Sequence, residues 1–195
     1  MTTKQLDAQT VEGTLKFLVA CGALKDTLRS GHTDGGHLEN TAAHSWRLAL
    51  WVIALEPYLA GYNVTTLLKL AILHDLGEAI TGDVPAIHQH GDQSARQAAE
   101  RAAVHTLSAS LDSELAGNIT ALAADYDGGL SKEAKLMKGL DKLETMLQHI
   151  TAEDPATFDY QFNLGYGRAW TDQGPLLPII RARIDALTQE RIAAK

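Results

Sequence analysis

The stretch of sequence that decides the fold is residues 70–83, which read LAILHDLGEAITGD. Its first residues are apolar and belong to a helix that the periodicity predicts over 65–80. That helix does not stay apolar, because its last turns carry His74, Asp75 and Glu78. Removing several ionisable groups from water is costly unless they bind a metal ion or one another. A metal site or a charge cluster is therefore expected where this helix ends.

The spacing within this stretch favours a shared ligand. His74 and Asp75 are adjacent, so their side chains project about 100° apart around a helix and can reach one ion from neighbouring directions. Glu78 follows His74 by four residues and lies on the same helical face. Gly82 ends the helix, and Asp83 follows it at the start of a loop.

Helical periodicity also dominates the rest of the chain, which predicts an all-α helical bundle in a single domain, 1–195. Its core is expected over about 8–153, and a C-terminal lid and helix over about 154–195. Asn40 and Ser131 are predicted N-caps. The predicted helices span about 8–29, 41–57, 65–80, 93–110, 114–125, 132–150 and 177–193, with a Gly- and His-rich loop over 30–37.

Composition limits the classes of function. The formal net charge is −7 and the pI is about 5.5, which argues against a nucleic-acid binder with a broad basic face. A small phosphorylated substrate stays compatible with this charge, because one arginine or one metal ion can attract it. The single cysteine, Cys21, suits a reducing compartment. No apolar run approaches the ~20 residues that span a bilayer, so a cytoplasmic protein is expected.

Two more polar residues interrupt apolar helical faces. His44 lies among Ala42, Ala43 and Trp46 in a helix expected to face a core, and Asp141 lies on the apolar side of the helix that carries Met137. Taken singly, His44 is typical of a hydrogen-bonded core histidine, and Asp141 of a solvated, salt-bridged face. Together with His74 and Asp75 they form a set of two imidazoles and two carboxylates, which suits one divalent Mn, Fe, Co, Ni or Zn ion.

This combination resembles the HD-domain phosphohydrolases, whose signature H…HD…D reads here His44, His74-Asp75 and Asp141. The resemblance extends to the motifs of the 5′-deoxynucleotidase branch. Residues 38–44 (LENTAAH) are similar to its (P/T)E(S/N)VxxH segment, and residues 74–83 contain its HDxxExxxGD motif in full. Residues 134–144 (AKLMKGLDKLE) are similar to its EAKxxKxLDxxE segment, so the resemblance covers about 15–150.

The resemblance implies hydrolysis of a nucleoside 5′-monophosphate to a nucleoside and phosphate. It implies that a metal ion is bound by His44, His74, Asp75 and Asp141. In the same way, Glu78 corresponds to the catalytic carboxylate that orients or deprotonates the attacking water, and Asp83 to an aspartate beside the sugar. A homodimer is also implied, because family members commonly form one.

The region around Arg29 departs from the family pattern. Arg29 corresponds to an arginine that contacts the substrate, where a guanidinium suits phosphate. The family usually has a tryptophan close behind it that packs on the sugar, whereas here Ser30, Gly31 and His32 follow. His32 is a candidate to fill that space, and the preference for a 2′-deoxy sugar stays open. Arg29 has the alternative role of a cation that complements the dipole at a helix C-terminus.

Other features leave alternatives. The aromatic-rich segment 158–170 suits either a lid or a homodimer interface. The pair His88 and His90 suits a solvated loop better than a second metal site, and His149 suits ordinary helix surface. For function, the alternatives are the same chemistry on another small phosphoester or a nucleoside triphosphate, a non-catalytic nucleotide-binding module, and a helical scaffold without a ligand.

Overall fold

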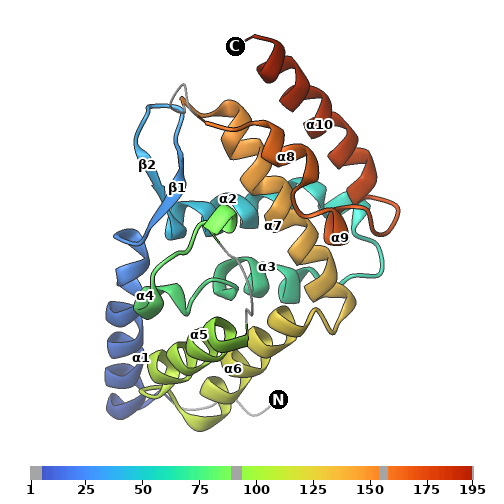
Figure 1. The fold of residues 1–195 in the computed structure, drawn as a ribbon. Coiled ribbons are helices and arrows are strands. Elements are labelled where there is room, and N and C mark those ends of the chain that lie inside the picture. The colour runs from blue at the N-terminus through green and yellow to red at the C-terminus, as the bar shows by residue number, and fades with distance from the viewer. Residues whose placement is uncertain (1–5, 89–93, 154–157, 195) are drawn as a thin grey trace.

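The computed structural model describes residues 6–88, 94–153 and 158–194 and is helical apart from one β hairpin (Figure 1). Its helices are α1 (Ala8–Cys21), α2 (Thr41–Leu55), α3 (Val64–Leu73), α4 (Glu78–Thr81), α5 (Ser94–Ser108), α6 (Ser113–Gly128), α7 (Lys132–Thr151), α8 (Gln161–Gly165), α9 (Arg168–Thr171) and α10 (Leu177–Ala193). The prediction of an all-α bundle is confirmed. Among the described helices, none has the length and apolar character needed to cross a membrane.

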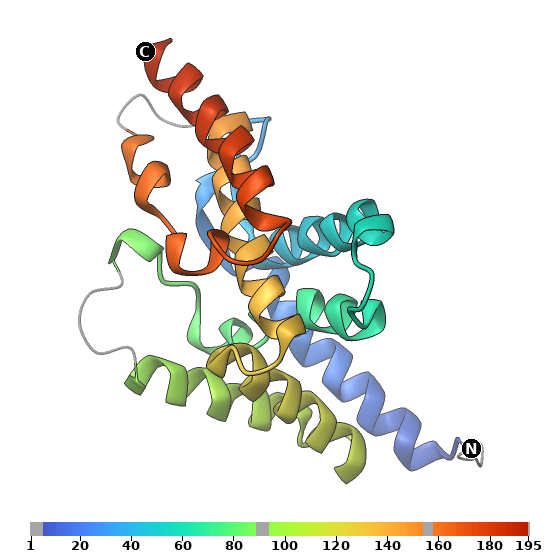
Figure 2. The ribbon, with the colours of Figure 1, turned by 90° about the vertical axis from the view of Figure 1, so that its right-hand side faces the viewer.

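Helix α7 is the centre of the bundle. It packs against α2, α3 and α6 on one side and against α9 and α10 on the other (Figures 1 and 2). Met137, Leu140 and Leu143 of α7 are completely buried in the main core, and a second, smaller core lies between α1, α5 and α6. Because α7 contacts elements from every part of the chain, residues on its surface meet residues that are far away in sequence.

Two predicted helix starts are confirmed by their caps. The Asn40 side chain accepts a hydrogen bond from the backbone N–H of Ala43, and the Ser131 hydroxyl accepts one from Ala134. Each bond satisfies an N–H that the first turn of a helix leaves without a partner. These caps fix where α2 and α7 begin, and these helices carry His44 and Asp141.

The N-terminal region differs from the prediction. Helix α1 ends at Cys21, and Arg29 lies in strand β1 (Leu28–His32), which pairs antiparallel with β2 (Leu38–Asn40). The hairpin is held against α7, where the Gln148 side chain donates to the backbone carbonyl of His32. Strands of five and three residues show too little alternation to be read from sequence. The predicted helix to Arg29 is therefore wrong, and the predicted loop over 30–37 is right only for 33–37, which connect the two strands.

The helix predicted over 65–80 is interrupted at its functional end. Helix α3 stops at Leu73, a turn carries His74 and Asp75, and α4 restarts at Glu78. The turn contains Gly77, where an added Cβ would lie 2.7 Å from the backbone oxygen of Glu100 in α5. Only glycine allows this close approach of the two backbones, and the break gives the ionisable side chains directions that a continuous helix would not.

Burial in α2 and in the C-terminal segment also differs in part from expectation. Leu48 and Val52 are fully buried, but Trp46, which the sequence placed toward a core, is 62% exposed. Helices α8 and α9 cover part of α7 and are tied to α10. Residue 154, where the C-terminal lid was expected to begin, lies outside the described residues. His90, the second member of the histidine pair, also lies outside them.

Candidate metal centre and active site

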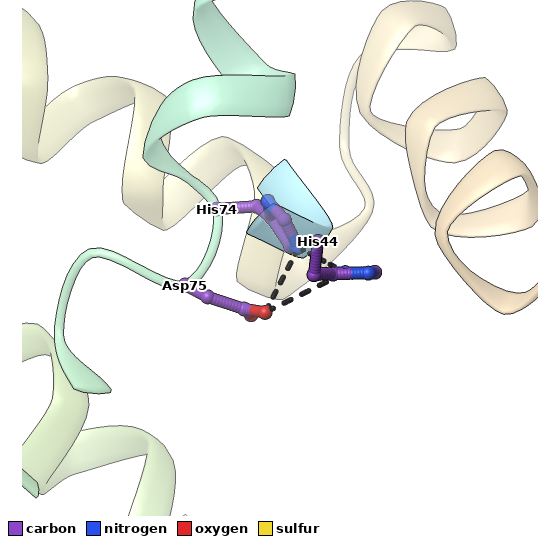
Figure 3. Close-up of side chains that lie close together, drawn as sticks. All are labelled: His44, His74 and Asp75. Atoms are coloured by element: carbon purple, nitrogen blue, oxygen red, sulfur yellow. Dashed lines mark hydrogen bonds and ion pairs between the residues drawn. The ribbon is translucent and has the colours of Figure 1, made fainter. Parts of the chain in front are cut away.

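The four predicted ligands lie close together, although they come from α2, α7 and the turn after α3. The ligand atoms of His44, His74 and Asp75 form one compact group, and Asp141 joins this group through its contact with His44. His44 Nε2 lies 3.2 Å from both His74 Nε2 and Asp141 Oδ1, and 3.8 Å from Asp75 Oδ2. His74 Nε2 lies 3.0 Å from Asp75 Oδ2. Figure 3 shows the side chains of His44, His74 and Asp75 directed toward one another. Atoms bound ~2.1 Å from one ion stand roughly 3.0–3.4 Å apart at neighbouring positions. Three of these spacings fall in that range and the 3.8 Å between His44 and Asp75 lies above it, so the cluster suits a shared metal ion after a small adjustment.

The hydrogen bonds of the two imidazoles on their far side also favour a metal site. His44 Nδ1 donates to Glu144 Oε2 at 2.5 Å, and His74 Nδ1 donates to the carbonyl of Ala71 at 3.1 Å. With Nδ1 protonated in each neutral ring, both Nε2 atoms present lone pairs toward each other. Two lone pairs beside two carboxylate oxygens make a set of acceptors that a cation completes. The donor set therefore fits a divalent metal.

The pKa values describe the same acceptor set in its metal-free form. Burial and Arg29 lower the pKa of His44, but Glu144 and Asp141 outweigh them and raise it to about 10. Burial raises the pKa of Asp75, yet His74 lowers it well below its usual range. Without a metal, a proton takes the place of the cation, and a metal ion that binds must displace it.

Residues behind the ligands hold them in place, and sequence reasoning did not assign them this role. Glu144, which is completely buried, bonds His44 and also accepts from Arg47 Nε at 2.5 Å. Asp141 Oδ2 accepts from the Tyr126 hydroxyl at 2.8 Å and from Lys142 Nζ at 2.9 Å, which leaves Oδ1 toward His44. Asp141 and Glu144 are therefore buried, and the reading of this face as solvated is wrong.

A second group of close ligand atoms, from Glu39, His44 and Glu144, is also buried. Here cations already balance both carboxylates. Arg47 binds Glu144, and Arg29 Nε lies 3.5 Å from Glu39. In addition, His44 Nδ1 is taken up by its hydrogen bond to Glu144, whereas His44 Nε2 faces His74 and Asp141. We therefore regard this group as a support for His44 rather than as a second metal site.

Glu78 and Asp83 lie beside the ligands on the same cavity. Buried Glu78 accepts from the Thr41 hydroxyl at 3.0 Å, and its other oxygen lies 3.9 Å from Arg96 Nη2. Burial, followed by Asp75 and Asp83, raises the pKa of Glu78 to about 9. Burial also raises the pKa of Asp83, which follows Gly82 at φ 74°, a left-handed conformation that favours glycine.

Arg29 faces this centre from the hairpin. Its Nη1 lies 3.3 Å from Asp75 Oδ2, and its Nη2 donates to the Thr145 hydroxyl at 3.3 Å. The alternative role of Arg29 at a helix C-terminus is wrong, because Arg29 lies in a strand. The structure places His32 differently from Arg29: among the described residues that line the cavity, Ser30 and Gly31 are present and His32 is not.

These groups open onto a cavity of about 530 Å³, a size within the range of small-molecule sites. Beside the predicted ligands Asp75 and Asp141, its walls include the segment after 157, which contributes Phe158, Phe162 and Tyr166. His149 also lines it; it is buried and donates from Nδ1 to the side-chain oxygen of Asn163 at 2.9 Å. The reading of His149 as helix surface is therefore wrong.

Comparison with known proteins identifies relatives of the whole arrangement. The HD domain family matches residues 21–179, which extends past the predicted limit of 150. The 5′-deoxynucleotidase HDDC2 of Bos taurus is 32% identical over 143 residues, covering 72% of this chain and 68% of that protein. The 5′-deoxynucleotidase hdd1 of Schizosaccharomyces pombe is 28% identical over 184 residues, covering 90% and 88%.

The fold is also found among solved structures. A predicted metal-dependent phosphohydrolase from Magnetospirillum magnetotacticum superposes with a TM-score of 0.76 at 24% identity, covering 95% of this chain and 96% of that one. This likeness shows that the two chains share a fold, and the family match covers most of the chain that forms the bundle around α7. The chain belongs to the HD domain family.

Proposed function

We propose that this chain is a metal-dependent 5′-nucleotidase that releases phosphate from nucleoside 5′-monophosphates. The observation that carries the proposal is the convergence of His44, His74, Asp75 and Asp141 on one point of a cavity large enough for a nucleotide. The curated relatives named as 5′-deoxynucleotidases support this substrate class.

In this mechanism, a metal ion held by the four ligands would polarise the phosphate and lower the pKa of a water molecule. Glu78 borders the cavity beside Asp75 and orients that water. Its pKa is about 9 without a metal, and the positive charge of a bound ion would lower that pKa, so that the ionised carboxylate can accept the proton of the water. Arg29 binds a phosphate oxygen through its guanidinium, which already faces the ligand cluster. Water adds to phosphorus and the bond from phosphorus to the 5′ oxygen breaks. That oxygen takes up a proton, returned from Glu78 or supplied by solvent, so that the neutral nucleoside leaves and Glu78 is ready for the next turnover.

Two residues complete the proposed site. We assign Asp83 to the sugar side of the substrate, because it lines the cavity and is the last residue of the HDxxExxxGD motif. Arg96 lies between Glu78 and Glu100, and its Nη1 is buried without a hydrogen-bond partner among the described residues. Arg96 also lines the cavity, where it adds positive charge beside Glu78. The donor set suits Mn, Fe, Co, Ni or Zn.

The test uses purified, metal-stripped protein and a panel of 5′-ribo- and 2′-deoxyribonucleoside monophosphates, with Mn²⁺, Co²⁺ or Zn²⁺ added back in turn. We expect phosphate release that depends on the metal, and the ratio of deoxy to ribo rates measures the sugar preference. Release only from other phosphoesters or from triphosphates would replace the substrate assignment. Stoichiometric metal binding without any turnover would instead indicate a nucleotide-binding module.

We also propose that the protein is cytoplasmic, since its single cysteine suits a reducing compartment.

We further propose that the chain forms a homodimer. The support for the dimer is a stripe of exposed apolar residues on α2, where Trp46, Leu50 and Ile53 follow one another at helical spacing. Covering this stripe would remove apolar surface from water. Light scattering on the wild type and on Trp46→Glu tests the dimer: the wild type should have twice the monomer mass, and the variant should be monomeric.

A further inference from the structure

The cavity extends well beyond the phosphate-binding end. Asp141, Thr145 and His149 of α7 all line it, and they lie on one face of the helix at four-residue spacing. At 1.5 Å of rise per residue, the line from Asp141 to His149 covers about 12 Å. A phosphate beside the proposed metal-binding residues therefore fills only one end of the cavity, and the other end has room for another part of the substrate.

That other end is rich in aromatic rings. Phe162 and Tyr166 lie with ring centroids 5.1 Å apart and planes at 30°, and Phe158 packs on His149 with centroids 4.7 Å apart. Phe158, Phe162 and Tyr166 are only partly buried, and all three line the cavity. Tyr166 also contacts Lys142, the neighbour of Asp141, so the aromatic wall is continuous with the metal ligands.

This wall is held in a fixed shape by a buried arginine. Arg181 of α10 is 2% exposed, and its guanidinium donates to the backbone carbonyls of Asn163, Leu164 and Tyr166 and to the Thr171 hydroxyl. Four bonds from one guanidinium tie α8 and the end of α9 to α10. A wall that is ordered before the ligand arrives spends little conformational entropy on binding.

We propose that Phe158, Phe162 and Tyr166 form the wall on which a nucleobase stacks, an inference that rests on the proposed nucleotidase activity. Planar aromatic ligands stack favourably on such rings, and stacking tolerates different bases because each has a π face. The segment 158–166 is then a substrate-binding wall rather than a homodimer interface.

The test compares two substrates that differ only in the base: the 2′-deoxynucleoside 5′-monophosphate that the wild type hydrolyses fastest, and 2-deoxyribose 5-phosphate. The variants are Phe162→Ala and Phe162→Leu, the second of which keeps an apolar side chain without a ring. The matched control is Leu164→Ala, on the same helix but not among the residues lining the cavity. All variants are checked for folding by circular dichroism and thermal melting.

We expect both Phe162 variants to lose about ten- to hundredfold in kcat/KM for the nucleotide, with little change for the sugar phosphate. Leu164→Ala should keep the wild-type kcat/KM for both substrates. The proposal is overturned by an unchanged nucleotide rate, by an equal loss for both substrates, or by a wild type that makes no distinction between them. If the wild type hydrolyses no nucleotide, the proposed function fails separately. Calorimetric titration with the free nucleoside then decides: weaker binding by Phe162→Leu than by wild type supports the wall, and equal or absent binding overturns it.

Discussion

Replacing Glu144 with Gln tests whether the carboxylate behind His44 holds the metal ligand in its binding form. Glu144 is completely buried and bonds His44 Nδ1 and Arg47 Nε, each at 2.5 Å. The glutamine amide has the same shape as the carboxylate, but it carries no negative charge and has only one oxygen that can accept a hydrogen bond. It therefore cannot accept from both His44 and Arg47 as the two carboxylate oxygens of Glu144 do. His44 then loses the interaction that fixes its tautomer and raises its basicity.

The expected effect on metal affinity follows from these contacts. Loss of a hydrogen-bonded carboxylate behind a metal-bound histidine typically weakens metal binding by about 10- to 100-fold, which corresponds to about 1.4–2.8 kcal/mol. The free energy of unfolding should also fall by about 1–3 kcal/mol, because the buried hydrogen bonds to charged groups are weakened. Affinity is measured by titrating the stripped protein with metal against a coloured chelator.

Glu133→Gln is the matched control. Glu133 is also a buried carboxylate of α7, 8% exposed, but it accepts from the backbone N–H of Asn63 at 2.9 Å and has no contact with a predicted ligand. It should lose stability and keep the wild-type metal affinity. Wild-type affinity in Glu144→Gln, or an equal loss in both variants, would refute the role given to Glu144.

Three further outcomes are expected. Asp141→Ala should lose metal binding in calorimetry and lose turnover with it; full metal occupancy would show that the ligand assignment is wrong. Glu78→Gln should bind metal with wild-type affinity and lose about 10²- to 10⁴-fold in kcat, whereas a rate near wild type would remove Glu78 from the mechanism. Burial and Arg29 lower the pKa of His44, but Glu144 and Asp141 raise it to about 10, so below that pH a metal must displace a proton. Metal affinity should therefore rise by about tenfold per pH unit from pH 6 to 9, and a flat profile would contradict the competition.

Two of the proposed ligands could be recognised from sequence because each interrupts an otherwise apolar helical face. His44 and Asp141 are polar residues among core residues of α2 and α7, and the structure brings them to within 3.2 Å of each other. Burying one of these ionisable side chains without a polar partner would be costly. The presence of several such residues on apolar faces therefore indicated that they lie beside one another. Helix periodicity and N-caps served equally well for α2 and α7.

The residues behind the ligands divide into those with a local signal and those without one. Glu144 lies three residues after Asp141 on the same face of α7, so helical spacing alone could have assigned it to the buried side. Tyr126 belongs to α6, and its bond to Asp141 depends on how α6 packs on α7. No pattern within either helix carries that information.

The hairpin and the aromatic wall depend on tertiary contacts in the same way. Strands β1 and β2 are too short to show a pattern, and the side chain of Gln148 on α7 anchors β1 through His32. The wall after residue 157 takes its shape from Arg181 in α10, about twenty residues further along the chain. Both elements line the cavity, so its outer walls could not be read from the sequence that predicts its centre.

The charges of the cavity link metal binding to phosphate binding. Its described walls carry more carboxylates than cations, and the neighbouring acids raise the pKa of Glu78 to about 9. A phosphate dianion that entered this metal-free cavity would meet repulsion at short range. A divalent cation held by the four proposed ligands would reverse the sign of the charge at the point where Asp75 binds Arg29. If Asp75 shares its charge with a metal, its ion pair with the Arg29 guanidinium weakens, and the guanidinium becomes available to the phosphate. The proposed site therefore predicts that phosphate binding depends on the bound metal.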